Sequence, residues 1–224
     1  MPDASFVPAA GRRGPLALYD PIVALTMRER TFRARLIAQA TAGAPSSVLE
    51  LGCGTGSLTA LLARALPSAA IAGLDPDEAA LARARVKLAA GRVDLSHVEL
   101  HLGSALELSM EDESFDRVVA SLVLHHLTDA QKRAALREAF RVLCPGGRLH
   151  IADWGAPQDP AMRGAFFALR LLDGFECTRA HARGELAGMI EQAGFSEVAR
   201  RDRLRTGWGT LELLSAKRIL PAVS

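Results

Sequence analysis

The chain has 224 residues and a formal net charge of +2. This length fits one domain with a sizeable core, and the small, dispersed charge gives no argument for nucleic acid or a membrane surface as partner. Three distant cysteines, Cys53, Cys144 and Cys177, have neither zinc-ligand nor disulfide spacing, and no apolar run resembles a signal peptide or membrane span. We therefore expect a soluble cytoplasmic protein without an integral membrane segment; the oligomeric state stays open.

The N-terminal part of the chain divides into two segments. Proline and glycine recur in residues 1–15, which we expect to form a flexible arm ahead of a single domain, 16–224. Within 16–44, apolar residues recur at helical spacing: Ile22, Leu25, Phe32 and Leu36. Gly43 is a typical helix stop, so the pattern predicts an N-terminal helix in 16–44.

Strand and helix patterns alternate in the middle of the chain. Predicted strands cover 48–51, 69–75, 97–103, 115–123 and 148–153. Predicted helices start near Leu58, at Pro76 and at Thr128, which has capping-box spacing to Gln131, whereas 144–147 (CPGG) reads as a turn. Two further strands, joined by a turn around TGWG, are expected in 195–218. The alternation predicts an α/β protein with a doubly wound, mostly parallel sheet and helices on both faces.

Residues 154–181 interrupt this alternation. Their apolar residues recur at helical spacing: Phe166, Phe167, Leu171, Leu172 and Phe175. We expect a helical insertion over the substrate site, with part of this stripe in the core and part lining an apolar acceptor site. Cys177 and His181 flank the insertion; a buried thiol and a surface histidine are the plainer interpretations, although both could face a substrate.

The stretch VLELGCGTGSLT, Val48 to Thr59, places three glycines between a strand and a helix. Such glycines let the backbone turn sharply and let a ligand contact main-chain N–H groups. Ser57 stands where a dinucleotide fingerprint has glycine or alanine, and no Gly-Lys-Ser/Thr follows. Glu50 would repel a pyrophosphate and attract a cation, and Asp75 ends the next strand, where a carboxylate can bind ribose hydroxyls. These residues predict a cationic, phosphate-free adenosine, S-adenosylmethionine.

Several segments in order resemble the motifs of class I S-adenosylmethionine-dependent methyltransferases. They are Val48–Thr59, IAGLDPDEAALARAR, HLGSALEL, ESFDRVVASLVLHHL and FRVLCPGGRLHIADW, and together they span roughly residues 45–155. The resemblance implies the Rossmann-like methyltransferase fold with a seven-stranded sheet and an N-terminal helical lid. A looser similarity to ubiquinone, menaquinone and phospholipid N-methyltransferases would place Tyr19 on that lid, over the cofactor.

The resemblance implies roles for the residues around the glycines. The turn under the methionine part of the cofactor would be shaped by Gly52, Cys53, Gly54 and Gly56. Glu50 would reach the ammonium group directly or through water, and Asp75 would hold the ribose.

Other implied cofactor contacts follow later strands. Pro76 would lie against the adenine, and the turn of Ser104 and Ala105 would meet its edge, although many relatives have an acid at the position of Ser104. Ser121 and Leu122 would line the path to the sulfonium.

Methyl transfer is an in-line displacement that needs alignment, exclusion of water and, for a protonated acceptor, a base. His125 and His126 after the fourth strand and Asp153 after the fifth are the candidate catalytic residues. A packing role for His126, and a capping or structural hydrogen bond for Asp153, are the competing interpretations. Ser121 stands where metal-assisted catechol methylation would need an acid, so no metal is expected.

These residues favour methylation of a small, partly apolar molecule at oxygen, nitrogen or carbon. The residues ASLV after the fourth strand lack the Asp/Asn-Pro-Pro-aromatic run of DNA amino-methylating enzymes, and protein arginine methylation would need paired glutamates there. The alternative is a relative that binds S-adenosylmethionine without methyl transfer or serves as a partner-binding subunit. A nicotinamide oxidoreductase is disfavoured by Ser57 and Glu50. The acceptor itself is not identified.

Overall fold

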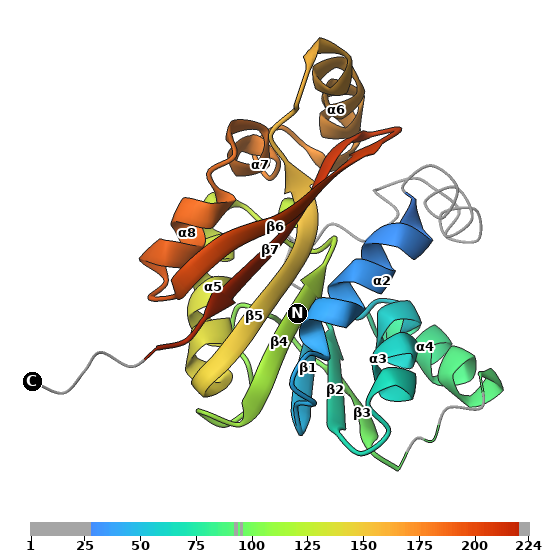
Figure 1. The fold of residues 1–224 in the computed structure, drawn as a ribbon. Helices are drawn as coiled ribbons and strands as arrows, with labels where there is room; N and C mark the ends of the chain where they lie inside the picture. The colour runs from blue at the N-terminus through green and yellow to red at the C-terminus, as the bar shows by residue number, and fades with distance from the viewer. Residues whose placement is uncertain (1–27, 92–93, 95, 220–224) are drawn as a thin grey trace, which may run out of the picture.

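The computed structural model describes residues 28–91, 94 and 96–219, and Figure 1 shows a central twisted sheet flanked by helices. The strands of this described part are β1 (Ser47–Leu51), β2 (Ala70–Asp75), β3 (Val98–Leu102), β4 (Phe115–Ser121), β5 (Leu143–Gly155), β6 (Ser196–Thr206) and β7 (Gly209–Lys217). Their order in the sheet is β3-β2-β1-β4-β5-β7-β6. All neighbours from β3 to β5 pair in parallel, and β7 is antiparallel to both β5 and β6. The predicted mostly parallel, seven-stranded sheet is confirmed.

Helices cover both faces of the sheet (Figure 1). One face carries α2 (Glu29–Ala40), α3 (Ser57–Ala65) and α4 (Glu78–Ala90), and the other carries α5 (Asp129–Val142) and α8 (Leu186–Gln192). Each face has its own apolar core: Phe32, Leu36 and Leu62 are fully buried in the first, and Leu136 and Met189 are buried in the second. The doubly wound arrangement follows from burial of both faces.

The strand order reverses between β1 and β4. From β1 the chain builds outward through β2 to β3, then crosses back to place β4 on the other side of β1. Glu50 lies opposite Val119 and Leu51 opposite Ala120 in this central pair. Because ligands of open α/β sheets bind beyond the carboxyl ends of the strands at such a switch point, the segments after β1 and β4 define the candidate site.

Two local predictions need correction. The helix expected at Pro76 begins at Glu78, because Asp77 is in extended conformation and its side chain accepts hydrogen bonds from the N–H groups of Ala79 and Ala80. The CPGG segment lies inside β5 rather than in a turn, and the pairing of β5 with β4 shifts register there. The capping box of Thr128 and Gln131 is confirmed at the start of α5.

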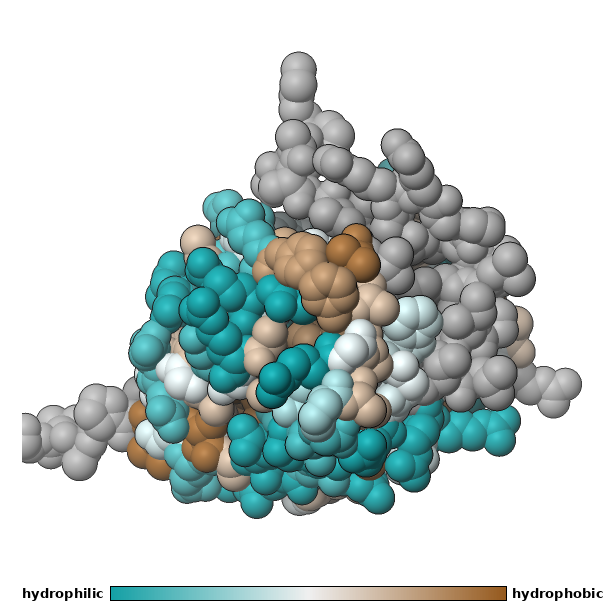
Figure 2. Space-filling model, turned by 90° about the horizontal axis from the view of Figure 1, so that it is seen from above, coloured by the Kyte–Doolittle hydropathy of each residue, from teal (hydrophilic) through white to brown (hydrophobic). Residues whose placement is uncertain are grey.

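The insertion forms α6 (Pro160–Asp173) and α7 (Arg179–Arg183) beyond the end of β5, at the top of Figure 1. Its apolar stripe divides, because Phe166 is buried against the sheet whereas Phe167, Leu171 and Phe175 are exposed. Figure 2 looks down on this end and shows the apolar surface over α6 beside hydrophilic surface. No described helix is long and apolar enough to cross a membrane.

Candidate active site

The glycine turn after β1 has a backbone that side chains would obstruct. Gly52, Gly54 and Gly56 all have positive φ, of 65°, 52° and 74°. A Cβ at Gly52 would lie 2.4 Å from a methyl group of Val123, and one at Gly56 would lie 2.9 Å from the Cβ of Ala84. A Cβ at Gly54 would meet no described atom within 4 Å. Val123 and Ala84 therefore pack against the turn at Gly52 and Gly56, whereas the space at Gly54 is open to described atoms.

Main-chain hydrogen bonds of Cys53 connect this turn to the sheet. Its N–H donates to the carbonyl of Leu74 at 2.9 Å, and its carbonyl accepts from the N–H of Gly56 at 2.9 Å. The side chain is buried, and burial raises the pKa of the thiol, which keeps the sulfur protonated. The main chain of Cys53 matters for the turn, and its thiol is no nucleophile.

Glu50 lies at the end of β1 beneath the turn and is only 2% exposed. The hydroxyl of Thr59 donates to its Oε2 at 2.6 Å, and no described residue donates to its Oε1. Burial raises the pKa of Glu50 from 4.5 to about 8, although the bond from Thr59 and the charge of Arg33 oppose the shift. In the free protein near pH 7 Glu50 is therefore mostly a neutral acid, and a cation placed at its Oε1 would favour the ionised form.

The raised pKa of Glu50 makes stability depend on pH. Between pH 4.5 and 8 the folded protein keeps a proton that the unfolded chain loses, so stability falls as pH rises through this range. The glutamine in Glu50→Gln cannot ionise, so the variant avoids this loss of stability, and its amide oxygen can still accept from Thr59. We expect the variant to match the wild type near pH 4 and to be more stable by on the order of 3 kcal/mol at pH 7.

Urea unfolding at several pH values measures the effect, with Glu191→Gln, at an exposed helix position, as the matched control. A Glu50→Gln protein with the same pH dependence of stability as the wild type would show that Glu50 is ionised in the free protein.

Asp75, at the end of β2, faces the same turn. Its Oδ2 accepts from the N–H of Gly54 at 2.8 Å, and its Oδ1 accepts from the N–H of Asp77 at 2.9 Å. Burial raises the pKa of this carboxyl, and these two bonds partly offset the rise. Each oxygen retains a second lone pair, so Asp75 both fixes the open glycine and can accept further hydrogen bonds.

A histidine cluster lies at the same edge and consists of His125, His126, Asp153, Asp173 and His181. Asp153 was expected after the fifth strand but lies within β5, which continues to Gly155. His125 Nδ1 lies 2.8 Å from Asp153 Oδ1, and Asp153 also accepts from the N–H groups of Leu124 and Trp154. On its other side, His125 Nε2 lies 3.8 Å from Asp173 Oδ2. His126 packs on His125, with ring centroids 4.0 Å apart. These contacts bring all three predicted catalytic residues together.

The two adjacent histidines have opposite electrostatic environments. Burial alone would lower the pKa of His125, but Asp153 and then Asp173 outweigh it and the net shift is upward. For His126, burial and the charge of His125 hold the pKa well below its usual range. Burial opposes ionisation of Asp153, yet His125 and His181 lower its pKa overall. His125 is thus the better proton acceptor, and Asp153 stays ionised to support it.

Asp173 was not predicted as a member of this site, and His181 was named only as a residue that could face a substrate. Asp173 ends α6, and its side chain is 15% exposed. His181 is fully buried, which corrects the surface interpretation; its ring lies 6.3 Å from that of His125. Cys177, predicted to be buried, is only half-buried, but its carbonyl binds the buried ammonium of Lys132. Asp173 and His181 both come from the insertion, and only their position in the fold shows that they belong to the site.

The remaining predicted cofactor residues lie around the glycine turn. Leu122 has a φ of 58° although it is not glycine, and its N–H donates to the carbonyl of Ala152 at 2.8 Å. It directly follows Ser121, the last residue of β4. Pro76 is exposed after β2, and Ser104, beside Ala105 after β3, accepts from the N–H of Leu106 at 3.2 Å. Tyr19 lies outside the described residues.

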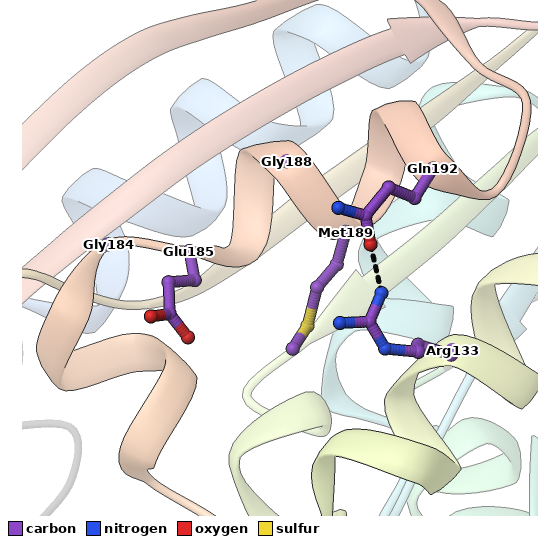
Figure 3. Close-up of a pocket in the computed structure, with 6 residues that line it drawn as sticks. All are labelled: Arg133, Gly184, Glu185, Gly188, Met189 and Gln192. Atoms are coloured by element: carbon purple, nitrogen blue, oxygen red, sulfur yellow. Dashed lines mark hydrogen bonds between the residues drawn. The ribbon is translucent and has the colours of Figure 1, made fainter.

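A surface hollow of about 310 Å³ lies apart from this edge, between α5 and α8 (Figure 3). Its lining contains no residue of the glycine turn or the histidine cluster: Arg133, Gly184, Glu185, Gly188, Met189 and Gln192. Arg133 donates to Gln192 across it, so its main charged donor is already engaged. We assign it no role in the chemistry.

Residues 48–147 match the family description of a methyltransferase domain. The chain is 34% identical over 172 residues to a demethylmenaquinone methyltransferase of Listeria monocytogenes, an alignment covering 68% of this chain and 71% of the relative. It is 30% identical to a ubiquinone/menaquinone biosynthesis C-methyltransferase UbiE of Syntrophotalea carbinolica, with 86% and 85% covered. The chain belongs to the class I S-adenosylmethionine-dependent methyltransferases. This methyltransferase acts on a small molecule and uses S-adenosylmethionine as cofactor.

A solved structure agrees with this fold. The N-methyltransferase NodS of Bradyrhizobium japonicum, in complex with S-adenosyl-L-homocysteine, superposes with a TM-score of 0.62 at 23% identity, covering 85% of this methyltransferase and 87% of NodS. The residues present here suit the cofactor, because no described atom fills the space at Gly54 and no described residue donates to Glu50 Oε1. The predicted fold and cofactor are confirmed.

Proposed function

We propose that S-adenosylmethionine binds over the glycine turn, with its ammonium group at Glu50 and its ribose at Asp75. In this proposal the main chain of 52–56 lies under the methionine part, Pro76 lies against the adenine, and Ser104 and Ala105 meet the adenine edge. The observation that supports it is the open space at Gly54, whose N–H donates to the buried Asp75, while Glu50 lies buried in the strand that leads into the turn. The dispersed free cysteines favour a cytoplasmic location.

Asp75→Ala tests the ribose assignment. We expect cofactor affinity to fall by about 10- to 100-fold, because hydrogen bonds to a charged acceptor contribute on the order of 1.5–3 kcal/mol. Asp77→Ala is the control, because Asp77 caps α4 and its loss costs about 1 kcal/mol of stability without touching the ribose position. Calorimetric titration with S-adenosylhomocysteine measures the affinity of each variant. Unchanged affinity in Asp75→Ala would refute the ribose assignment.

The acceptor is proposed to bind beside the histidine cluster, with Ser121 and Leu122 along the path to the sulfonium. This position is supported by Val123, which contacts the glycine turn at Gly52 and lies two residues before His125. His125 would accept the proton of the acceptor at Nε2, because Nδ1 is engaged by Asp153. His126, whose pKa is depressed, would act as a positioning residue.

Methyl transfer needs few further groups from the protein. The bound cofactor supplies a methyl group on an activated sulfonium, so the S–CH3 bond breaks as the bond from methyl to acceptor forms. The acceptor's proton moves to His125 Nε2, and the ionised carboxylate of Asp153 stabilises the resulting imidazolium. Leu122, held in its strained conformation by Ala152, would help align the acceptor.

Methyl transfer to a small, partly apolar acceptor is tested by product analysis. The names of the curated relatives point to quinone-like acceptors, and that of NodS to nitrogen. We expect labelled S-adenosylmethionine incubated with quinol, phenol and amine acceptors to give S-adenosylhomocysteine and one methylated product in equal amounts. Cofactor binding without a methylated product from any of these acceptors would favour the non-transferring alternative.

A further inference from the structure

Two imidazoles and a carboxylate, side chains of the kinds that bind transition metals, meet at the end of α6. His125 and His126 lie in a short 3-10 helix after β4, Leu124–His126, and Asp173 is the last residue of α6. One potential ligand atom from each of the three lies within 4.8 Å of the other two. The fold, and not a local sequence motif, brings these side chains together.

The separation between His125 and Asp173 suits a shared metal ion. His125 Nε2 and Asp173 Oδ2 are 3.8 Å apart, too far for a direct hydrogen bond. Ligands of a tetrahedral zinc ion at about 2.05 Å lie about 3.3 Å apart, so this pair would have to close by about 0.5 Å. Asp173 ends its helix with its side chain 15% exposed, so it can adjust and an ion can reach it from solvent.

Asp153 holds His125 in the orientation that a metal ligand needs. The carboxylate of Asp153 lies 2.8 Å from His125 Nδ1 and is itself fixed by the N–H groups of Leu124 and Trp154. An ionised carboxylate only accepts, so Nδ1 carries the hydrogen and the lone pair of a neutral His125 is on Nε2. Metal-binding histidines commonly direct their other ring nitrogen to a carboxylate in this way.

The charges around the three side chains also favour a cation. Two carboxylates, Asp153 and Asp173, lie on opposite sides of His125. The buried ammonium of Lys132 is bound by two main-chain carbonyls and faces Asp129, and no described ion pair joins it to either carboxylate. A divalent ion at His125 Nε2 would bring positive charge to both.

We propose that a divalent zinc-type ion binds His125 Nε2, a ring nitrogen of His126 and the carboxylate of Asp173, and that it inhibits methyl transfer. Binding breaks no bond between heavy atoms, and a proton on a coordinating nitrogen is released to solvent. The ion would take the Nε2 lone pair that receives the proton of the acceptor. The site itself does not depend on the proposed function, whereas the inhibition rests on it. Methyl transfer itself is still expected to need no metal.

Metal binding is measured on the full chain, free of any affinity tag and treated with a chelator. Zinc chloride is titrated calorimetrically, and the visible absorption of added cobalt(II) reports tetrahedral coordination. We expect one ion per chain, with affinity at least tenfold weaker in Asp173→Asn. Two controls should bind zinc like the wild type: Glu176→Gln, at an exposed carboxylate three residues along, and Cys177→Ser, which removes a half-buried thiol nearby in the chain.

The titration decides the site without any assay of activity. Absence of zinc binding, unchanged affinity in Asp173→Asn, or loss of binding in Cys177→Ser would each overturn it. Inhibition is then measured with labelled S-adenosylmethionine and the acceptor that gives most product among the quinol, phenol and amine acceptors.

Turnover should fall with half-inhibition near the dissociation constant of zinc, and a chelator should restore it. Zinc that binds but leaves turnover unchanged or raises it would overturn the inhibition. Failure of the metal-free wild type to methylate any of these acceptors would instead contradict the proposed function, and with it the inhibition, whereas the zinc site is decided by the titration alone.

Discussion

Gly54→Ala is expected to weaken cofactor binding by up to about 100-fold while leaving the fold intact. Gly54 has a φ of 52° and open space where its Cβ would be, so the unliganded protein can accommodate the methyl group. The cofactor, in our account, fills that space against the main chain. Overpacking by one methyl typically costs about 1–3 kcal/mol, which is roughly a 5- to 100-fold loss of affinity.

Gly146→Ala is the matched control for this variant. Gly146 has a φ of 81° and likewise no described atom within 4 Å of its Cβ position, but it lies near the amino end of β5. Both substitutions should cost about 1–2 kcal/mol of stability, because alanine disfavours positive φ. Only Gly54→Ala should change the dissociation constant for S-adenosylhomocysteine. Equal affinities in the two variants would mean that the cofactor does not approach this turn.

Asp153→Asn is expected to lower turnover by on the order of 10²–10⁴-fold, with little change in cofactor affinity. The substitution keeps the shape of the side chain but removes the charge that stabilises the His125 imidazolium. Asp153 accepts from His125 and Trp154 at one oxygen and from Leu124 at the other. Asparagine has only one acceptor oxygen, so some stability is lost as well. Turnover is measured by formation of S-adenosylhomocysteine at saturating cofactor, below the melting temperature of the variant.

The control for Asp153→Asn makes the same chemical change elsewhere. Asp159 caps α6 by accepting from the N–H of Met162, and asparagine is an equally good cap. Asp159→Asn should therefore leave turnover unchanged. If Asp153→Asn kept full turnover, Asp153 would be a structural residue only, the other interpretation that the sequence allowed.

The parts of the fold that local pattern determines could be predicted from the sequence. The alternating strands and helices, the capping box at Thr128 and the glycine turn each depend on residues close together in the chain. The start of α4 was misplaced because two local signals compete: Pro76 favours a first helical position, but the carboxylate of Asp77 caps the helix directly.

The features that escaped prediction depend on contacts between distant segments. The CPGG segment stays in β5 because Gly146 donates to the carbonyl of Arg218 and Gly147 accepts from the N–H of Arg218, near the other end of the domain. His181 lies in the polar segment RAHAR, and only its bond to Trp154 explains its burial. Asp173 reaches His125 through the placement of a whole helix. Neither side chain has a local pattern that indicates the site.

A crystal structure of the full chain with S-adenosylhomocysteine is the measurement that tests the central claim most directly. The account predicts the amino group of the ligand within about 3.5 Å of Glu50 and its ribose hydroxyls within the same distance of Asp75. It also predicts that the sulfur faces the histidine cluster past Leu122. A ligand bound away from the glycine turn, or with its sulfur directed away from His125 and Asp173, would contradict the account.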